Sequence, residues 1–562
     1  MVAPYASETF SADERDVLRH YMTNLDGPVF ALMNLPEVVC GALFARYSRS
    51  AKSLRRLFLD EFLGDLDVSG DTSIDATVGL HRAEQLYQRV FLDFGDDSVA
   101  QLGGVHLACE QASNVLTKVL EWGRLMAYLE QSTRYVPYDS RLATGHYRYW
   151  RDPEVLESDL GARYVGDMDR MFDTYTELLP LLQAHLVRAF PNDGTVADLA
   201  YRQSVRAGAL DALRGLLPAG ALSNVGIYGS GQSYEQLLLR MRGHPLPEVR
   251  GYAELILQEL RKVIPSFLSR LDRPERGGEW TRYLAERRAE MDDLVGRLFP
   301  AERSEGDAVS AKAAVRLTDF DPAGEEKVLV AMCYPHSSLA ESELTSRIRR
   351  LGNDERAAIV AAYVGNRQNR RHKPGRALER TSYRFEIVSD YGAFRDLQRH
   401  RMLTIEWQEL STDLGYEVPE IVAEAGLAAA YTDSLERSRE LHDTLLAAFP
   451  LQAIYAVALA FRLRYSLQLN AREAMHLIEL RSTPQGHPVY RRIAQQMHHL
   501  IDEQAGHHAL AAAMRFVDFA ADGLGRLDAE RRAAARGTAF HGSGELGDGG
   551  GADPRQNASR IP

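Results

Sequence analysis

A polar stretch of small residues divides this chain into two halves. From Ala301 to Ala314 the sequence reads AERSEGDAVSAKAA, and its few apolar residues follow no strong regular period. The chain has 562 residues, and single hydrophobic cores stop growing beyond about 250–300 residues. We therefore predict a first domain over residues 1–300, a linker over 301–320 and a second domain over 321–536.

The end of the chain differs in composition from both halves. Residues 537–562 are dominated by Gly, Pro and polar side chains. Such a segment buries too little apolar surface to offset the loss of chain entropy on folding. We predict a disordered Gly-rich tail.

Apolar spacing predicts the fold class. Residues that recur every three or four positions predict helices, and contiguous or alternating β-branched and aromatic residues predict strands over Lys327–Met332 and Tyr383–Val388. We therefore expect an α+β protein in which each half packs many helices on a small mixed or antiparallel sheet. The main helical ranges are Arg15–Met22, Leu54–Leu63, Glu110–Leu129, Ala253–Arg270, Leu427–Ala448 and Ala471–Leu480.

Charge and apolar content exclude several classes of partner. The formal net charge of −12 argues against a protein that coats nucleic acid or an anionic membrane. The most apolar segment, Leu451–Phe461, is too short to span a bilayer. The three cysteines form no Cys-x-x-Cys pair, which fits a reducing compartment. We expect a cytoplasmic protein without nucleic-acid or membrane partners.

One histidine pattern resembles a metal site but lacks its usual context. His499, Glu503 and His507 follow one another at intervals of four on a predicted helix. There is no His-Glu-x-x-His pattern and no second ligand cluster, so a solvated or interface face is the better interpretation. We predict no metal.

The first group of polar residues that suggests chemistry is Glu130, Ser132 and Arg134. If the chain is extended there, the three side chains project from the same side. A hydroxyl beside a guanidinium fork suits a phosphate or another small anion. The alternative is a capped helix end with a surface ion pair.

A second group is the run Arg399-His400-Arg401. Two arginines that flank a histidine in an apolar neighbourhood concentrate positive charge, which requires an anionic ligand or an acidic partner. The alternative is a basic patch on the surface.

Further basic residues lie on predicted helices in both halves. Arg472 and His476 are four residues apart on a helix that starts near Asn470, and the first half offers Arg214 and Arg240. The alternative is a set of ordinary amphipathic helices with solvated arginines.

Residues 95–135 resemble, without a gap, the signature stretch of the flavin-dependent thymidylate synthases. That family ends the stretch with Arg-His-Arg-x-x-Ser-x-Asn-Glu-x-Ser-x-Arg-Tyr. In this chain the last Arg of the triplet is Arg124, and Glu130, Ser132, Arg134 and Tyr135 are retained, whereas the Arg-His pair is lost.

The second half is similar to the family in a complementary way. Its Arg-His-Arg triplet is intact, but the segment that follows is two residues longer and has Asp413 where the family has its anion-binding Arg. The run from Asn470 to Arg481 resembles the family helix whose early residues contact flavin and whose last Arg contacts the pyrimidine. Arg401 lies 277 residues after Arg124, and Arg481 lies 241 residues after Arg240.

The resemblance implies a tandem duplication whose halves have specialised. Members of the family are homotetramers with active sites at subunit interfaces, so we expect a homodimer that mimics such a tetramer. The implied catalytic residues, which would stabilise negative charge on the pyrimidine ring, are Arg240 or Arg481. The implied substrate-binding residues are Glu130, Ser132, Arg134 and Arg214. The implied residues for FAD are Glu379, Arg399, His400, Arg401, Asn470, Arg472 and His476.

The reaction that the resemblance implies is the reductive methylation of dUMP to dTMP. Methylenetetrahydrofolate would supply the methylene group, FAD would carry hydride and NADPH would be the reductant. None of the cysteine contexts resembles an activated nucleophile, which fits a chemistry without a protein nucleophile. Two alternatives stay open: a flavin enzyme that acts on another uridine nucleotide, and an inactive homologue that binds nucleotide or flavin.

Overall fold

The computed structural model describes residues 5–6, 8–35, 43, 47, 50–62, 104–299, 314–520, 525, 527 and 531. The predicted tail and most of the predicted linker lie outside these residues, as do residues 95–103 of the signature stretch. Residues 314–320 were also assigned to the linker, but they form a strand that pairs with the strand at 382–390.

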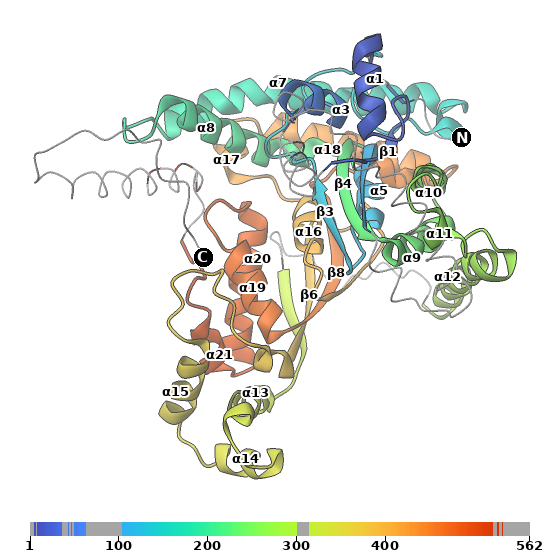
Figure 1. Cartoon of the computed structure of the whole chain (residues 1–562). Coiled ribbons are helices and arrows are strands. Elements are labelled where there is room, and N and C mark those ends of the chain that lie inside the picture. The colour runs from blue at the N-terminus through green and yellow to red at the C-terminus, as the bar shows by residue number, and fades with distance from the viewer. Residues whose placement is uncertain are drawn as a thin grey trace, which may run out of the picture.

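Two four-stranded antiparallel sheets lie side by side at the centre of the protein (Figure 1). Their strand orders are equivalent, β1-β2-β4-β3 in one and β5-β6-β8-β7 in the other. This confirms the predicted α+β class with a small sheet in each half, and the sheets are antiparallel. The strands are β1 (Val29–Ala31), β2 (Gly104–Ser113), β3 (Met126–Glu130), β4 (Leu222–Ser230), β5 (Ala314–Phe320), β6 (Ser382–Asp390), β7 (Thr404–Trp407) and β8 (Arg462–Asn470).

Helices of the first half cover the top and one side of the sheets in the view of Figure 1. The long helix α7 lies across the top, and α9 to α12 lie at the right. These helices are α1 (Ala12–Tyr21), α3 (Leu54–Leu57), α5 (Asn114–Leu120), α6 (Pro153–Leu156), α7 (Gly161–Ala189), α8 (Asp198–Leu213), α9 (Gly231–Arg242), α10 (Pro247–Leu260), α11 (Pro265–Leu268) and α12 (Glu279–Leu298).

Helices of the second half cover the opposite side and the lower end, except that α17 and α18 lie in the upper part, near α8 and α7 (Figure 1). They are α13 (Gly324–Cys333), α14 (Glu341–Ile348), α15 (Asn353–Val364), α16 (Tyr391–Gln398), α17 (Glu420–Glu424), α18 (Ala428–Leu446), α19 (Ala471–Arg481), α20 (Pro488–His499) and α21 (His508–Ala513).

The helix predicted over Glu110–Leu129 is wrong. The range contains the end of β2, helix α5 and most of β3. Only the part after Ser113 is helical, because the Ser113 hydroxyl accepts a hydrogen bond from the Leu116 amide and starts α5 there. The residues before it pair with β4 instead, so tertiary pairing overrides the local helical spacing.

The strand predicted over Lys327–Met332 is also wrong, because these residues lie within α13. Val328, Leu329, Val330 and Met332 are all buried. A short apolar run that is buried on all sides has no period that would separate a strand from a helix. The strand predicted over Tyr383–Val388 is confirmed within β6.

The two halves meet through reciprocal backbone hydrogen bonds at the centre of the protein. The Ala219 amide donates to the Val457 carbonyl at 2.7 Å, and the Leu459 amide donates to the Leu217 carbonyl at 2.8 Å. These four residues are completely buried, and the contact pairs equivalent positions as an isologous interface does. One continuous apolar core extends across both halves.

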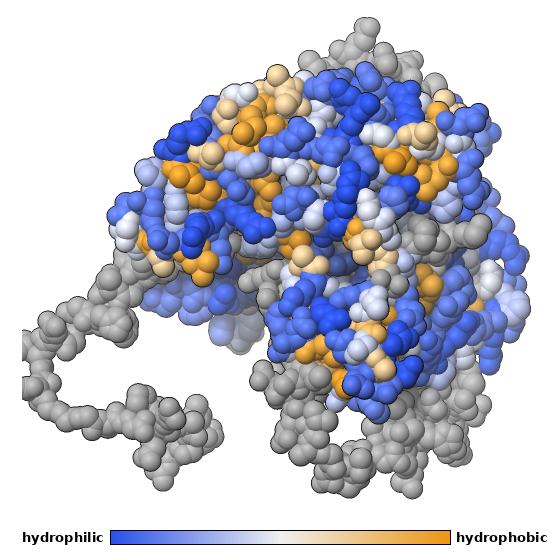
Figure 2. Space-filling view, turned by 90° about the horizontal axis from the view of Figure 1, so that it is seen from above, coloured by the Kyte–Doolittle hydropathy of each residue, from blue (hydrophilic) through white to orange (hydrophobic). Residues whose placement is uncertain are grey.

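The outer surface is mostly polar. Seen from above in Figure 2, hydrophilic residues cover most of the described surface and the apolar patches are separated from one another. Exposed apolar side chains on α7 and α8 include Leu181, Val187 and Leu199. Among the described residues, none of the helices combines the length and apolar character needed to cross a bilayer.

A buried carboxyl group also joins the halves. Glu248 on α10 accepts hydrogen bonds from the Ser113 amide at 2.9 Å, the Ser113 hydroxyl at 2.7 Å and the Tyr455 hydroxyl at 2.8 Å. Burial raises the pKa of Glu248 to about 7 although these hydrogen bonds oppose the shift. The folded state therefore holds this proton more tightly than the unfolded chain does.

We predict that Glu248→Gln weakens the pH dependence of stability. In the natural protein the stability from this group is complete below about pH 4.5, where both states are protonated, and falls as pH rises to about 7. A shift of this size corresponds to ~3 kcal/mol. Chemical denaturation over this pH range measures the difference in slope between the two proteins.

The control is Glu254→Gln on the same helix, where the side chain is 52 % exposed. The control should leave the slope as it is in the natural protein. An unchanged slope in Glu248→Gln would contradict the account of this group.

Candidate functional site

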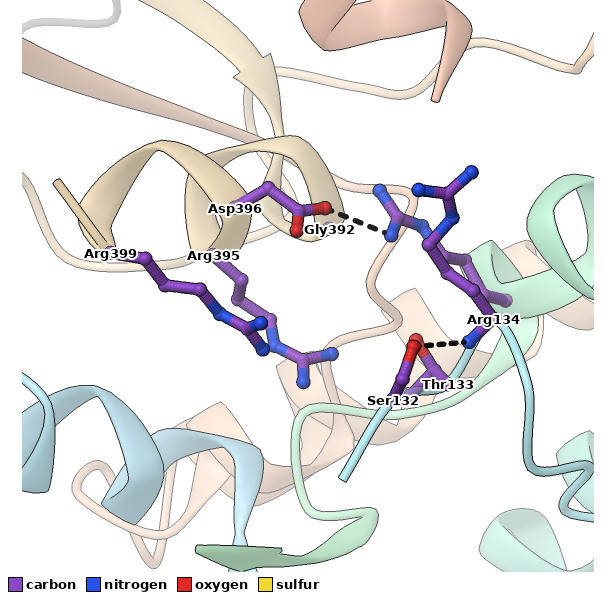
Figure 3. A pocket seen from close by; sticks show the side chains of 8 residues that line it. Ser132, Thr133, Arg134, Gly392, Arg395, Asp396 and Arg399 are labelled. Carbon is purple, nitrogen blue, oxygen red and sulfur yellow. Dashed lines mark hydrogen bonds and ion pairs between the residues drawn. The ribbon is translucent and has the colours of Figure 1, made fainter. Parts of the chain in front are cut away.

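A small polar pocket lies where the two halves meet (Figure 3). Arg395 and Arg399 lie on one side of it and Arg134 lies on the other, with Ser132 and Thr133 from the first half nearby (Figure 3). Both halves therefore contribute to one site. The lining residues are Ser132, Thr133, Arg134 and Arg214 from the first half and Gly392, Arg395, Asp396 and Arg399 from the second.

The segment after β3 is a turn and not an extended strand, so the expectation that Glu130, Ser132 and Arg134 share one side is wrong. The amides of Tyr135 and Val136 both donate to the Ser132 carbonyl, at 3.2 and 3.0 Å. The Ser132 hydroxyl accepts from the Arg134 amide at 3.2 Å. The turn sends Ser132 and Arg134 into the pocket, while Glu130 faces a buried ion cluster whose Arg395 and Arg399 also line the pocket.

Glu130 is the centre of that buried cluster. It is 1 % exposed and contacts Lys118 of its own half at 3.3 Å. It also contacts two arginines of α16 and its C-terminal end, Arg395 at 2.5 Å and Arg399 at 2.6 Å. Burial alone would raise the pKa of Glu130, but Arg395, Lys118 and Arg399 together hold it well below its usual range.

Arg134 is held in place by groups from both halves. Its guanidinium makes two hydrogen bonds to the Asp211 carboxylate, both at 2.6 Å. It also donates to the Tyr490 hydroxyl at 3.0 Å and to the Gln485 carbonyl at 2.6 Å. Such a clamp fixes the orientation of the guanidinium fork.

Arg214 is only partly satisfied. Its Nη1 contacts Asp396 at 3.2 Å, whereas within the described part of the chain its buried Nε and Nη2 have no hydrogen-bond partner. A Cβ at Gly392 would lie 3.1 Å from Nε and 3.2 Å from Nη2. Glycine therefore leaves space beside two unpaired donors, a situation that is costly unless a ligand satisfies them.

The Asp396 carboxylate is surrounded by arginines. Burial would raise its pKa, but Arg214, Arg481, Arg399 and Arg134 hold the pKa well below its usual range. The Arg481 guanidinium donates to the Asp396 carbonyl and lies 3.9 Å from the carboxylate. Asp396 thus remains ionised and neutralises only part of the local charge.

The ion pairs leave a positive excess at this site. Lys118 is matched by Glu121 at 2.5 Å. Of the described residues that remain in these clusters, five guanidinium groups face three carboxylates. The arginines are Arg134, Arg214, Arg395, Arg399 and Arg481, and the acids are Glu130, Asp211 and Asp396. A fourth buried acid, Asp390, faces Arg214, although burial raises its pKa, so the excess is at least one positive charge.

His400 lies next to this pocket and is 7 % exposed. Its Nδ1 is 2.9 Å from Glu473, and its Nε2 accepts from Arg481 Nε at 3.0 Å. The His476 ring is 5.5 Å away, between centroids. Burial lowers the pKa of both imidazoles, with Arg481 adding to the effect at His400. Both rings are therefore neutral near pH 7.

The other residues assigned to flavin surround the start of α19. The Asn470 side chain caps this helix at the Glu473 amide, at 2.9 Å. Arg472 contacts Glu379 at 3.1 Å. Arg401 instead reaches across to the first half, where it donates to the Met126 carbonyl. Glu379, Asn470 and Arg472 thus gather at the start of α19, whereas Arg481, which contacts Asp396 at the pocket, is the last residue of that helix.

Arg240 does not line the pocket. Its guanidinium lies over the Trp122 ring, 5.6 Å from the centroid, and burial lowers its pKa. Trp122 in turn packs edge-on against Trp407, at 5.5 Å and 74°. Arg124 and Arg401 are equivalent positions that are 277 residues apart, and by the same offset Arg399 is equivalent to Trp122 and Trp407 to Glu130. The residues equivalent to the Glu130–Arg399 ion pair are therefore these two tryptophans.

Several residues of the site were missed by sequence reasoning. Arg395 lies one helical turn before Arg399 and Asp211 lies three residues before Arg214, so helical spacing could have suggested both. Glu473 lies three residues before His476 on α19 in the same way. Asp396 likewise lies three residues before Arg399, whereas Thr133, Gly392 and Tyr490 carry no signal of this kind.

The residues considered for metal binding are separated. His499 lies 3.7 Å from Glu503, whereas His507 contacts the Tyr383 hydroxyl at 2.8 Å. A different set of possible ligands, His400, Glu473 and His476, lies within 4.8 Å of one another. Burial raises the pKa of Cys109 and Cys333, so neither thiol is activated, and Cys40 lies outside the described residues.

Known proteins resemble this chain over most of its length. A UPF0159 protein of Chlamydia muridarum (strain MoPn / Nigg) is 40 % identical over 536 residues, which are 94 % of this chain and 99 % of the relative. A UPF0159 protein of Thermoplasma acidophilum is 34 % identical over 523 residues, 88 % of this chain and 98 % of the relative.

A solved structure is also similar to part of the chain. It is a UMP/dUMP methylase, PolB from Streptomyces cacaoi, bound with 5-Br dUMP. It is 18 % identical with a TM-score of 0.30, over 37 % of this chain and 98 % of that chain. A TM-score this low does not establish a shared fold.

The family model described as thymidylate synthase complementing protein matches the chain in two separate regions, residues 45–266 and 316–505. The matches fall on the two halves, each of which carries one of the equivalent sheets. The chain therefore belongs to the thymidylate synthase complementing protein family, as a tandem pair of two diverged copies.

Proposed function

We propose that this protein is a flavin-dependent thymidylate synthase that methylates dUMP to dTMP with methylenetetrahydrofolate and NADPH. The observation that carries the proposal is the composite pocket, in which guanidinium groups outnumber the buried acids and, among the described residues, Arg214 has two buried donors without a hydrogen-bond partner. A nucleoside monophosphate carries a phosphate group, whose negative charge suits this positive excess.

The phosphate would be held mainly by the first half. Ser132 and Arg134 lie in one turn, and Arg214 faces them from the end of α8. The Asp211 clamp already orders Arg134, so little side-chain entropy is lost when an anion binds. The Glu130 carboxylate is already paired with Lys118, Arg395 and Arg399. We therefore propose that it holds the two arginines in place and does not contact the ligand.

The second half has cationic side chains that could bind the pyrophosphate of FAD. Arg401 and Lys373 are exposed and Arg472 is partly exposed at the start of α19, near His400 and His476, which suits a pyrophosphate beside neutral rings. We propose that Glu379, Arg399, His400, Arg401, Asn470, Arg472 and His476 form this site. Bound flavin would supply hydride transfer.

Arg481 is the better candidate for the catalytic arginine. It lies beside Asp396 at the pocket and is fixed by His400, whereas Arg240 lies over Trp122. A fixed guanidinium can stabilise negative charge that develops on a pyrimidine without reorganising in the reaction.

We also propose a homodimer. The halves already pack through reciprocal contacts within one chain, so two chains supply the four family copies of a tetramer. Light scattering of the purified protein measures the mass in solution, and a stable monomer would contradict this part of the proposal.

The direct test of the proposed activity uses the purified full chain. We predict that it binds FAD, seen as flavin absorbance that stays with the protein, and that it forms dTMP from dUMP when both co-substrates are present. Flavin binding without dTMP formation would favour another uridine nucleotide as substrate. A protein that takes up no flavin would favour the inactive homologue.

Arg214→Met tests the phosphate site independently of turnover. Charge-assisted hydrogen bonds contribute about 1.5–3 kcal/mol each, so dUMP affinity should fall ~10- to 100-fold. The affinity for uncharged deoxyuridine should stay nearly unchanged. Calorimetric titration measures both, and Arg206→Met, an exposed position on the same helix, is the matched control.

The result that would contradict this assignment is an equal loss of affinity for dUMP and for deoxyuridine. Equal losses would mean that Arg214 acts on the fold and not on the phosphate.

The tryptophan pair predicts the stoichiometry. At the position equivalent to the Glu130–Arg399 ion pair, Trp122 packs against Trp407, and Arg240 lies over the Trp122 ring. The tryptophan rings occupy the place of the charged side chains that border the pocket. We therefore predict one dUMP per chain in a calorimetric titration. Two equivalent sites per chain would show that the second position is open.

A further inference from the structure

Three residues form a hydrogen-bonded chain that leads to Arg481. The Glu473 carboxylate lies 2.9 Å from His400 Nδ1, and Arg481 Nε lies 3.0 Å from His400 Nε2. Glu473 and Arg481 both lie on α19, and His400 follows α16. The imidazole therefore bridges two positions that are two helical turns apart.

The direction of each hydrogen bond follows from elementary chemistry. A guanidinium has donors and no acceptor, so Arg481 must donate and His400 Nε2 must accept. A neutral imidazole then carries its proton on Nδ1, and this N–H donates to Glu473. The partner on each side thus selects the same tautomer.

The surroundings keep His400 in the neutral form. The side chain is 4 % exposed, and burial together with Arg481 lowers its pKa well below the usual value. A protonated ring would have no lone pair for Arg481, so the neutral state is required for the bond.

Arg481 is restrained at more than one point. It also donates to the Asp396 carbonyl, and its guanidinium lies over the Tyr490 ring, 5.3 Å from the centroid. The hydrogen bond from Nε to His400 Nε2 fixes the orientation of the guanidinium plane. In the other tautomer of His400, Nε2 would carry a proton, and this N–H would face the N–H of Arg481.

We propose that Glu473 is a positioning residue that selects the Nδ1–H tautomer of His400 and thereby orients the guanidinium of Arg481 at the pocket. The consequence for catalysis rests on the proposed function, which gives Arg481 its contact with the pyrimidine. The tautomer itself does not depend on that function.

A metal ion held by His400, Glu473 and His476 is the competing explanation of this cluster. It is less favoured because Nδ1 of His400 must carry a proton while Arg481 donates to Nε2. Lys373, Arg401 and Arg472 also act on Glu473 as positive charges and would oppose a cation there. The metal content of the protein therefore belongs to the test.

The experiment compares Glu473→Leu, which removes the acceptor, with Glu473→Gln, which keeps a neutral one. Nitrogen-15 spectra of histidine-labelled protein, with His400→Gln to assign the signal, report which ring nitrogen carries the proton. We expect Nδ1–H in the natural protein, a partial shift toward Nε2–H in Glu473→Gln and the larger shift in Glu473→Leu.

Asp502→Asn is the control, because it alters a histidine–carboxylate pair, Asp502 with His508 at 2.7 Å, that lies outside the pocket. It should leave the His400 signal unchanged. An unchanged tautomer in Glu473→Leu would overturn the proposal, as would a stoichiometric metal ion in the purified natural protein that Glu473→Leu lacks.

The kinetic consequence is a separate measurement. Misplacing a guanidinium should lower kcat ~10- to 100-fold in Glu473→Leu and less in Glu473→Gln, with little change in KM for dUMP. A rise in KM at constant kcat would show that Glu473 acts on binding and not on Arg481. If the natural protein has no activity but the tautomer shifts as expected, the proposed function fails while the positioning role stands.

Discussion

The buried carboxylate of Glu130 is the interaction on which the composite site depends. It belongs to the first half, yet two of its three cationic partners, Arg395 and Arg399, belong to the second. Removing one partner from a buried ion cluster costs about 3–5 kcal/mol, because the remaining charges lose their compensation. This cluster therefore fixes the position of α16 relative to β3, and the pocket lies between them.

The same constraint explains why the two halves can differ at equivalent positions. A buried position tolerates a charge that is paired or an apolar group, whereas a charged or polar group without a partner is costly there. One side of the interface has the ion pair of Glu130 and Arg399, and the other has Trp122 against Trp407. The charged version borders the pocket with the two unpaired donors of Arg214, whereas at the tryptophan pair Arg240 has one among the described residues, its buried Nε. A duplicated chain can keep one such site and use the other position for packing between the halves.

Residue types and motif order predicted much of the site but not its geometry. Ser132, Arg134, Arg214 and Arg399 were all assigned to ligands, and they meet at one pocket. The counter-charges Asp211 and Asp396 were not predicted. Each lies three residues before an arginine, but this spacing does not show that the two acids pair with the distant Arg134 and Arg214. Arg240 and Arg481 were both candidates for the catalytic arginine in the sequence, and only the fold separates them.

The secondary structure shows the same limit. Amphipathic spacing predicted α18 and α19 within a few residues, since one face of each is buried and the other is polar. It failed over β2 to β3 and at α13. In the first case pairing with β4 overrode the helical period, and in the second all-round burial removed the period.

The most direct test of a single site built from both halves is the rate at which NADPH reduces bound flavin anaerobically, with and without dUMP. Residues of the first half are proposed to hold the nucleotide and residues of the second to hold the flavin. The account predicts that dUMP accelerates the reduction, and that Arg214→Met removes the acceleration while Arg206→Met keeps it. A reduction rate that dUMP does not change would contradict the composite site.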